Sequence, residues 1–413
     1  MDARLLDTLQ NASIATRTMQ LINQETKNKA LQAISQALLE NIDSICKEND
    51  KDIQLAKENG LTTAMIDRLL LTKEGIESMA SDVLKVIDLH DPINEIIETI
   101  DRPNGLCIKK VKIPIGVIGV IYESRPNVTV DIATLCIKTN NVCVLKGGKE
   151  ARYSNVILVN VITEAIKGIL PVNTVNLIET SDRKITDALI KSNEYVDVII
   201  PRGGASLIQY VVKNATVPVI ETGAGICHLY VDKEADVNKA LAIAYNGKVQ
   251  RPSVCNAIET IIVHKDVANT FLPLLKQAFD KVPVTIYGDT ITSTIIDCLL
   301  VTNANYATEY GDYVVNIKVV EQINEAIEHI YQYSTKHSET IVSENKDTCE
   351  LFLNALDSAC VYANASTRFS DGGEFGFGAE VGISTQKLHA RGPMGLQELT
   401  SYKYKIYGNG QIR

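Results

Sequence analysis

Short runs rich in β-branched residues alternate with helical patterns from Ile115 onward, and this alternation limits the folds open to the chain. The first series of predicted strands covers residues 115–121, 141–145, 174–178, 196–200 and 217–220. The second covers residues 229–231, 257–264, 282–287, 313–319, 339–343 and 358–362. Such alternation predicts mostly parallel sheets with helices on both faces. Two series in succession, in a chain of 413 residues, predict two α/β domains joined near residues 222–225.

The N-terminal region has a different pattern. Residues 1–100 are predicted to be helical, with Thr26 as the N-cap of a helix whose apolar stripe is Leu31, Ile34, Leu38, Ile42 and Ile45. The turn signal Arg102-Pro103-Asn104-Gly105 predicts that residues 101–114 form a hairpin that leaves this helical body.

Composition excludes several classes of protein. Lys and Arg together number 41 against 50 Asp and Glu, a net charge of −9, which disfavours a nucleic-acid binder. The longest apolar run, residues 113–122, is too short to cross a membrane, and no secretory signal is visible at the N-terminus. Nine cysteines without a C-x-x-C pair are typical of reduced thiols. We therefore expect a cytoplasmic protein without nucleic-acid or membrane partners.

Common ligand motifs are missing from the sequence. Gly223-Ala224-Gly225 and Gly376-Phe377-Gly378 lack the third glycine of a Rossmann turn, and no P-loop occurs. No H-x-x-x-H pair and no Cys/His cluster has zinc spacing, so we expect no metal site.

Cys255 differs from the other cysteines, most of which have the apolar neighbours of a buried small hydrophobe. It follows a predicted helix, 237–245, with Asn246-Gly247 as a stop signal. A loop containing Arg251 then leads to Cys255, just before the predicted strand 257–264. A cation beside a thiol favours the thiolate. A nucleophile and a buried structural thiol both remain open from these residues alone.

Several motifs resemble the aldehyde dehydrogenase superfamily. Glu221-Thr222-Gly223-Ala224-Gly225 followed by Cys255 is similar to its Glu-x-Gly-Gly and nucleophilic-cysteine pair. Longer stretches resemble its glutamate-5-semialdehyde dehydrogenase (gamma-glutamyl phosphate reductase) family from the N-terminal helices to Tyr407: YESRPNVTVDIA (122–133), VLKGGKEA (144–151), IPRGG (200–204), ETGAGICHLYVD (221–232) and the block from Val320 to Ile341.

The resemblance implies a fold and a reaction. The fold would have two parallel-sheet α/β domains: residues 1–224 for the cofactor, with the hairpin 101–114, and residues 225–390 for catalysis. Residues 391–413 would form a C-terminal return and oligomerisation segment. The reaction would be NADPH-dependent reduction of L-glutamate 5-phosphate to L-glutamate 5-semialdehyde and phosphate through a cysteinyl thioester, in L-proline biosynthesis. A separate glutamate 5-kinase would supply the substrate, and a homo-oligomer, a dimer, is expected.

The resemblance also implies site residues. Cys255 is the expected nucleophile, and Asn127 the oxyanion donor, with a structural cap for a helix beginning near Thr129 as the alternative for Asn127. The expected cofactor residues are Lys146, Lys149, Gly203, Gly204 and Glu309. A cation at Lys149 favours the 2′-phosphate of NADPH; the alternatives are a solvated loop charge for Lys149 and a surface carboxylate for Glu309. The substrate candidates are Arg125, Ser124, Arg251, Arg368 and His337. Glu221 matches the water-activating residue of hydrolytic relatives, and its role here stays open.

Two rival interpretations remain. One is a hydrolytic NAD-dependent aldehyde dehydrogenase, and the other is a non-catalytic protein on the same scaffold.

Overall fold

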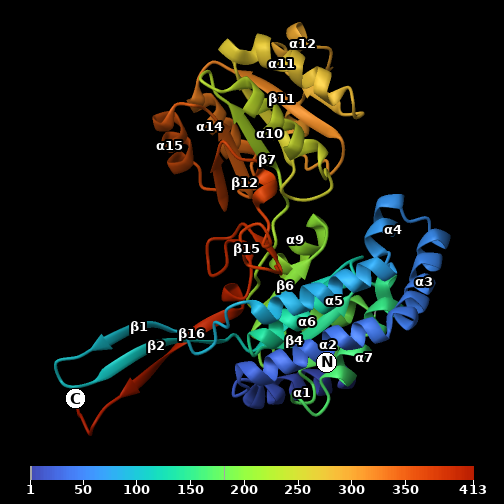
Figure 1. Ribbon diagram of the computed structural model, residues 1–413, viewed down its shortest axis with the longest axis vertical. Helices are drawn as coiled ribbons and strands as arrows, with labels where there is room; N and C mark the ends of the chain where they lie inside the picture. Colours follow the sequence, from blue (N-terminus) through green and yellow to red (C-terminus); the bar gives the residue numbers. More distant parts are fainter. Residues whose placement is uncertain (1, 181) are drawn as a thin grey trace. The chain divides into compact units, whose positions relative to one another are not determined.

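The computed structural model describes residues 2–180 and 182–413 and divides the chain into two compact units. Unit 1 comprises the residues up to Thr222 together with 376–382 and 394–413. Unit 2 comprises residues 223–375 and 383–393. Figure 1 colours the chain by sequence and labels its elements.

Unit 1 begins with helices and continues with alternating strands and helices. Its helices are α1 (Ala3–Met19), α2 (Gln24–Glu40), α3 (Ile42–Glu58), α4 (Thr63–Leu69), α5 (Lys73–Asp88), α6 (Asn127–Lys138), α7 (Arg152–Ala165), α8 (Arg183–Leu189) and α9 (Ala205–Asn214). Its strands are β1 (Ile96–Asp101), β2 (Cys107–Pro114), β3 (Val117–Tyr122), β4 (Val142–Gly147), β5 (Val175–Leu177), β6 (Val198–Arg202) and β16 (Thr400–Tyr407).

The N-terminal helices differ in detail from the prediction. The N-cap of α2 is Asn23, not Thr26, because the Asn23 side chain accepts a hydrogen bond of 2.9 Å from the Thr26 N–H. The apolar stripe is divided between two helices, since α2 ends before Asn41 and α3 begins at Ile42. Residues 96–100, predicted as helix, belong to β1.

A parallel sheet with the order β5-β4-β3-β6 forms the core of unit 1. Every residue of β3 is buried, as expected for a strand with both faces covered. The predicted strand 217–220 does not form, and only one bridge joins Val219 to Ile199. Pro218 lies within this segment and has no N–H to extend a ladder.

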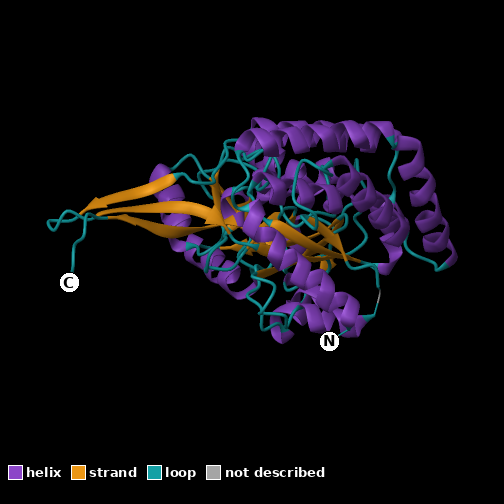
Figure 2. Cartoon of the chain, turned by 90° about the horizontal axis from the view of Figure 1, so that it is seen from below, coloured by secondary structure: helices purple, strands orange, loops and turns teal. Residues whose placement is uncertain are grey.

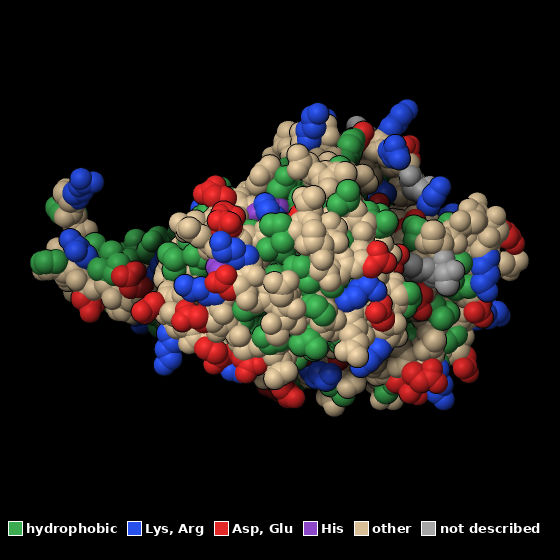
Figure 3. All heavy atoms as spheres, turned by 90° about the horizontal axis from the view of Figure 1, so that it is seen from above, with side chains coloured by type: hydrophobic (Ala, Val, Ile, Leu, Met, Phe, Trp, Pro, Cys, Tyr) green, Lys and Arg blue, Asp and Glu red, His purple; other side chains and the backbone are tan. Residues whose placement is uncertain are grey.

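A second sheet of unit 1 is antiparallel, with the order β1-β2-β16. Figures 1 and 2 show it extending away from the helices of the unit. The predicted hairpin is present but begins earlier, at Ile96, and β16 pairs with β2 over its full length. Hydrophobic side chains are exposed along this sheet (Figure 3), among them Ile96, Ile97, Tyr402, Tyr404, Ile406 and Tyr407.

Unit 2 is built around a seven-stranded parallel sheet with the order β10-β9-β11-β8-β7-β12-β13. These strands are β7 (Cys227–Val231), β8 (Ile258–His264), β9 (Thr285–Gly288), β10 (Leu299–Leu300), β11 (Val314–Val320), β12 (Ser338–Val342) and β13 (Cys360–Ala363). The helices are α10 (Val237–Val249), α11 (Lys265–Phe279), α12 (Thr292–Ile295), α13 (Asn303–Tyr306), α14 (Ile323–Tyr333) and α15 (Lys346–Ala355). The short strands β14 (Gly382–Ser384) and β15 (Gly392–Met394) pair with each other.

Successive side chains of the unit 2 strands enter two cores, as the two-residue period of a strand requires. Leu229 and Ile261 pack with side chains of α10 and α11. Their neighbours Tyr230 and Ile262 pack with side chains of α14 and α15. These two helices lie on the other face of the sheet from α10 and α11 (Figure 1). The predicted α/β fold with two parallel sheets is therefore confirmed.

Candidate active site

Most of the residues predicted to bind the cofactor lie at the carboxyl edge of the parallel sheet in unit 1. Lys146 lies near the end of β4, beside Ile121 of β3, and Gly203 and Gly204 directly follow β6. The chain runs from β3 to β4 and β5 on one side and returns to β6 on the other side of β3. Ligands of open parallel sheets bind at such a switch point, beyond the carboxyl ends of the strands.

Lys146 and Lys149 have different environments at this edge. Lys146 is only 6% exposed. Burial lowers the pKa of its ammonium group, while Asp182 and Glu150 act in the opposite direction. Lys149 is exposed in a short 3₁₀ turn that precedes α7.

Glu123, which the sequence analysis did not identify, contacts the predicted glycine turn. Its carboxylate accepts a hydrogen bond of 2.9 Å from the Gly204 N–H at the N-terminus of α9. A Cβ atom at Gly203 would lie 2.4 Å from the Glu123 Oε2, so only glycine fits here without a shift. A carboxylate thus lies beside the turn predicted to receive cofactor phosphate. The signal available in the sequence was its position directly before Ser124.

Ser124 is held by a second carboxylate that the sequence analysis missed. Its backbone N–H and its hydroxyl donate to the Glu150 Oε1 at 2.8 and 2.9 Å. The positive φ of 41°, unusual for a residue other than glycine, fixes a sharp bend between β3 and α6. Arg125, the next residue, is exposed.

Asn127 is the first residue of α6, whose N-cap is Pro126, so the alternative of a cap for a helix near Thr129 is wrong. Its amide donates to the Asp131 Oδ2 at 3.0 Å, one helical turn away. Burial raises the pKa of Asp131 to about 7, against the opposing effect of Arg202. The predicted oxyanion donor is therefore oriented by a carboxyl group that sequence alone did not indicate.

Glu221 is the last residue of unit 1 for which the resemblance suggests a role. It is half-buried just before Thr222, whose hydroxyl donates to the Pro201 carbonyl at 2.8 Å.

Cys255 lies in unit 2 on the loop between α10 and β8, and its side chain is partly exposed. The predicted end of the preceding helix at Tyr245 is wrong, because α10 continues to Val249. Gly247 lies inside the helix, where a Cβ atom would be 2.2 Å from the Ile258 Cδ1. This glycine therefore permits close packing of α10 on β8.

The backbone of Cys255 rests on the glycine segment that precedes β7. A Cβ atom at Gly225 would lie 1.5 Å from the Cys255 carbonyl oxygen. The Cys227 thiol donates to the same oxygen at 3.2 Å. Glu309, although exposed, accepts a hydrogen bond of 2.9 Å from the Gly225 N–H. The structure thus brings Glu309 to the segment that supports Cys255.

A buried ion pair lies on the two elements that flank the Cys255 loop. Lys248 of α10 and Glu259 of β8 are 2.9 Å apart, with exposures of 0% and 1%. Burial lowers the pKa of Lys248 and raises that of Glu259 to about 7, although each charge favours the other. This pair could not be predicted from the sequence, since charged residues are seldom fully buried.

The substrate candidates of unit 2 differ in their access to solvent. Arg251 is exposed, and Arg368 is half-buried and donates to Gln250 and Asn256 on the Cys255 loop. His337 is 0% exposed, burial lowers its pKa to about 4, and its Nδ1 lies 2.9 Å from the Ser338 hydroxyl. A neutral, fully buried imidazole is poorly placed to contact a substrate.

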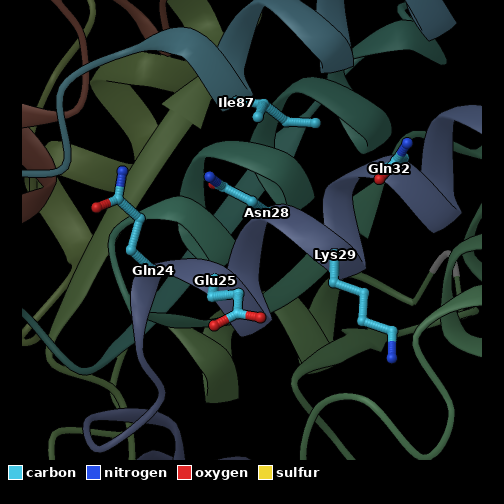
Figure 4. Close-up of a pocket in the computed structure, with 6 residues that line it drawn as sticks. All are labelled: Gln24, Glu25, Asn28, Lys29, Gln32 and Ile87. Carbon is cyan, nitrogen blue, oxygen red and sulfur yellow. The ribbon is translucent and has the colours of Figure 1, made fainter.

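The hollow shown in Figure 4 is a different feature, lying along α2 in unit 1 with a volume of about 600 Å³. Exposed and half-buried side chains line it: Gln24, Glu25, Asn28, Lys29, Gln32 and Ile87. None of these is a predicted site residue. Within residues 2–180 and 182–413, no group of three or more His, Cys, Asp or Glu side chains could hold a metal ion. The same residues contain no helix long and apolar enough to cross a membrane.

Comparisons with known proteins agree with the resemblance in the motifs. Residues 3–297 match the aldehyde dehydrogenase family. A gamma-glutamyl phosphate reductase of Clostridium novyi (strain NT) is 51% identical over 411 residues, which cover 99% of each chain. The crystal structure of a Thermotoga maritima gamma-glutamyl phosphate reductase has a TM-score of 0.97 and 44% identity and covers 99% of each chain. An engineered glycolyl-CoA reductase with bound NADP⁺ shares the fold, with a TM-score of 0.71, 17% identity and coverage of 97% of this chain and 96% of its own.

Proposed function

Because this chain belongs to the aldehyde dehydrogenase family and, within it, to the gamma-glutamyl phosphate reductases, we propose that it reduces L-glutamate 5-phosphate to L-glutamate 5-semialdehyde and phosphate. NADPH is the proposed cofactor, and L-proline biosynthesis the proposed pathway. The observation that carries the proposal is the placement of Cys255, a partly exposed thiol whose backbone is supported by Gly225 and Cys227.

The proposed reaction begins at the Cys255 sulfur. The thiolate attacks the acyl carbon, an S–C bond forms, and phosphate leaves with the electrons of the C–O bond. Asn127, oriented by Asp131, and the Cys255 N–H are the proposed donors to the oxyanion of the tetrahedral intermediate. When bound, NADPH would supply the hydride that reduces the thioester to the aldehyde, with Cys255 leaving as the thiolate.

The sheet edge of unit 1 is the proposed place for the phosphates of the dinucleotide, and the Glu123 carboxylate, which accepts the Gly204 N–H, would have to give way to them. Gly203 and Gly204 give close access to the backbone at the start of α9, and the nearby Lys146 supplies a cation. The exposed Lys149 is proposed to favour the 2′-phosphate of NADPH. Glu309 is proposed to contact the nicotinamide ribose. Residues 1–224, which contain four of the five proposed cofactor residues, are proposed for cofactor binding, and residues 225–390 for catalysis.

Substrate binding needs cations for an α-carboxylate and a phosphate. Arg251 and Arg125 are the exposed candidates, and Ser124, Arg368 and His337, which are buried or half-buried, are proposed only in supporting roles. A separate glutamate 5-kinase is the proposed source of the substrate. Failure of the two proteins to copurify at physiological salt would count against a stable complex.

We propose a homodimer formed through the three-stranded sheet, with residues 391–413 supplying β16. Apolar and aromatic side chains on this sheet are unusually exposed: Tyr404 by 53% and Ile406 by 61%. Light scattering would give a dimer for the native chain and a monomer for Tyr404→Glu/Ile406→Glu. A native monomer at every concentration would refute the dimer.

The test of function uses the oxidative direction, with semialdehyde as substrate and formation of reduced nucleotide as the signal. The proposal requires phosphate or arsenate, a higher rate with NADP⁺ than with NAD⁺, and loss of about 10³-fold or more in Cys255→Ser. Turnover without phosphate would favour the hydrolytic rival, with Glu221 as the candidate base. Absence of turnover under all conditions would favour a non-catalytic protein. Mass spectrometry of the acylated protein should locate the adduct on Cys255.

A further inference from the structure

Arg368 joins the two ends of the loop that carries Cys255. It lies in the 3₁₀ turn Thr367–Phe369, after β13. Its Nε donates to the Gln250 Oε1 at 3.1 Å, and its Nη1 donates to the Asn256 Oδ1. Gln250 directly follows α10, and Asn256 directly follows Cys255. One planar guanidinium therefore spans the whole loop.

The turn that carries Arg368 is itself fixed to the loop. The Asn256 amide donates to the Ser370 carbonyl at 2.8 Å, and the Thr367 hydroxyl donates to the Asn256 carbonyl at 2.7 Å. Thr367 and Ser370 are 0% exposed. These bonds hold the Arg368 backbone in register with the residue next to the candidate nucleophile, so that a movement of one element moves the other.

Positive charge gathers at this loop. Burial lowers the pKa of Arg368 and the neighbouring Arg251 lowers it further, while Asp371, Cys255 and Cys227 act in the opposite direction. An arginine remains protonated at physiological pH even so. The Arg368 guanidinium is thus close enough to influence the Cys255 thiol, and a nearby cation favours its thiolate form.

We propose that Arg368 is a positioning residue, which fixes the Cys255 loop through Gln250 and Asn256 and favours the Cys255 thiolate. This inference rests on the proposed function in one respect, that Cys255 is the nucleophile. It moves Arg368 from the substrate candidates to the support of the nucleophile, and leaves Arg251 as the exposed cation for substrate phosphate or carboxylate.

Two variants separate the bridging role from the charge. Arg368→Lys retains the charge but cannot donate from two fixed positions of a plane. Gln250→Ala removes one end of the bridge, keeps both arginines and changes an exposed residue, so it should fold. Arg368→Gln removes both functions. Arg391→Gln is the matched control, because Arg391 is a half-buried arginine of the same unit that bonds to Asp357.

The measurements are kcat, KM, and the pH profile of iodoacetamide alkylation, followed at Cys255 by peptide mass spectrometry. In Arg368→Gln, kcat should fall by about 10- to 100-fold with little change in KM. The alkylation midpoint should rise by roughly half a pH unit or more. Arg368→Lys should restore the midpoint but only part of kcat. Gln250→Ala should lower kcat without moving the midpoint, and Arg391→Gln should change neither.

The result that would overturn the inference is an alkylation profile and kcat in Arg368→Gln that match those of Arg391→Gln. A selective rise in KM would also overturn it, since it would return Arg368 to substrate binding. Full activity in Cys255→Ser would instead refute the proposed function. If Arg368→Gln fails to fold, the other two variants test the inference. It is supported if Arg368→Lys and Gln250→Ala both lower kcat without moving the alkylation midpoint, and it is refuted if both keep the wild-type kcat.

Discussion

Replacing Lys248 by methionine tests the energetics of the buried ion pair next to the Cys255 loop. Lys248 and Glu259 are 2.9 Å apart and almost completely buried, and the other bond to the Glu259 carboxylate is a 3.2 Å contact from the Gly311 N–H. Without Lys248 the carboxylate must either stay charged in an apolar site or take up a proton.

Removing the cation changes the protonation of Glu259. Beside Lys248 its pKa is raised by burial to about 7, and without the Lys248 charge it rises further, so the carboxyl group is neutral at pH 7. Loss of one partner of a buried pair generally costs about 3–5 kcal/mol. We therefore expect Lys248→Met to lower the free energy of unfolding by about 3–5 kcal/mol at pH 7. The double variant Lys248→Met/Glu259→Met, which removes both charges at similar volume, should recover most of this loss.

The pH dependence gives a second signature. In the folded wild type, Glu259 takes up a proton as the pH falls through about 7 and its charge attraction to Lys248 is lost, so the destabilisation by Lys248→Met should shrink below that pH. Urea unfolding followed by circular dichroism suits a chain that has no tryptophan. A loss below about 1 kcal/mol at pH 7, or a double variant no more stable than the single one, would refute the reasoning.

Three further predictions concern single positions. Gly225→Ala should lower kcat by about 100-fold, because its Cβ would overlap the Cys255 carbonyl oxygen. Gly75→Ala, whose Cβ would make only an ordinary 3.5 Å contact, should leave kcat unchanged. Equal kcat values in the two variants would contradict this prediction. Lys149→Glu should reduce the preference for NADP⁺ over NAD⁺ by about tenfold in kcat/KM, and an unchanged ratio would make Lys149 a loop charge. In the wild type, the folded state keeps a proton on Asp131 up to about pH 7, so stability from this group is present below pH 4 and falls between pH 4 and 7. Asp131→Asn should flatten that slope in thermal melts, and an equal slope would refute the assignment.

The fold could be predicted from the sequence where local patterns carry the information. Alternating β-branched and helical segments indicated both parallel sheets, since strands buried on both faces need continuous apolar runs. Prediction failed where tertiary contacts determine the ends of an element or the pairing of a strand. Gly247 is a typical helix stop, yet Ile258 packs against it and the helix continues. The alternating pattern of 400–407 could have indicated β16, but its partner, residues 107–114, lies far away in the sequence.

The motifs of the candidate site could be predicted from the sequence, but the side chains that hydrogen-bond to these motifs could not. Cys255, Lys146 and the glycine turn could be found because each lies in a short recognisable segment. The carboxylates that hold these segments could not: Glu150 bonds to Ser124 across 26 residues, and Glu123 to Gly204 across 81. Such contacts follow from the pairing of β3 with β4 and β6, which no local pattern encodes.

The late arrival of β16 has a consequence for biosynthesis. β2 ends at Pro114 and β16 begins at Thr400, so the ribosome makes all of unit 2 before the third strand exists. During that time the nascent hairpin presents an unsatisfied row of backbone amides and carbonyls, the kind of edge that recruits foreign strands. Chaperone capture and co-translational misassembly should therefore concentrate on this hairpin until translation reaches the final segment.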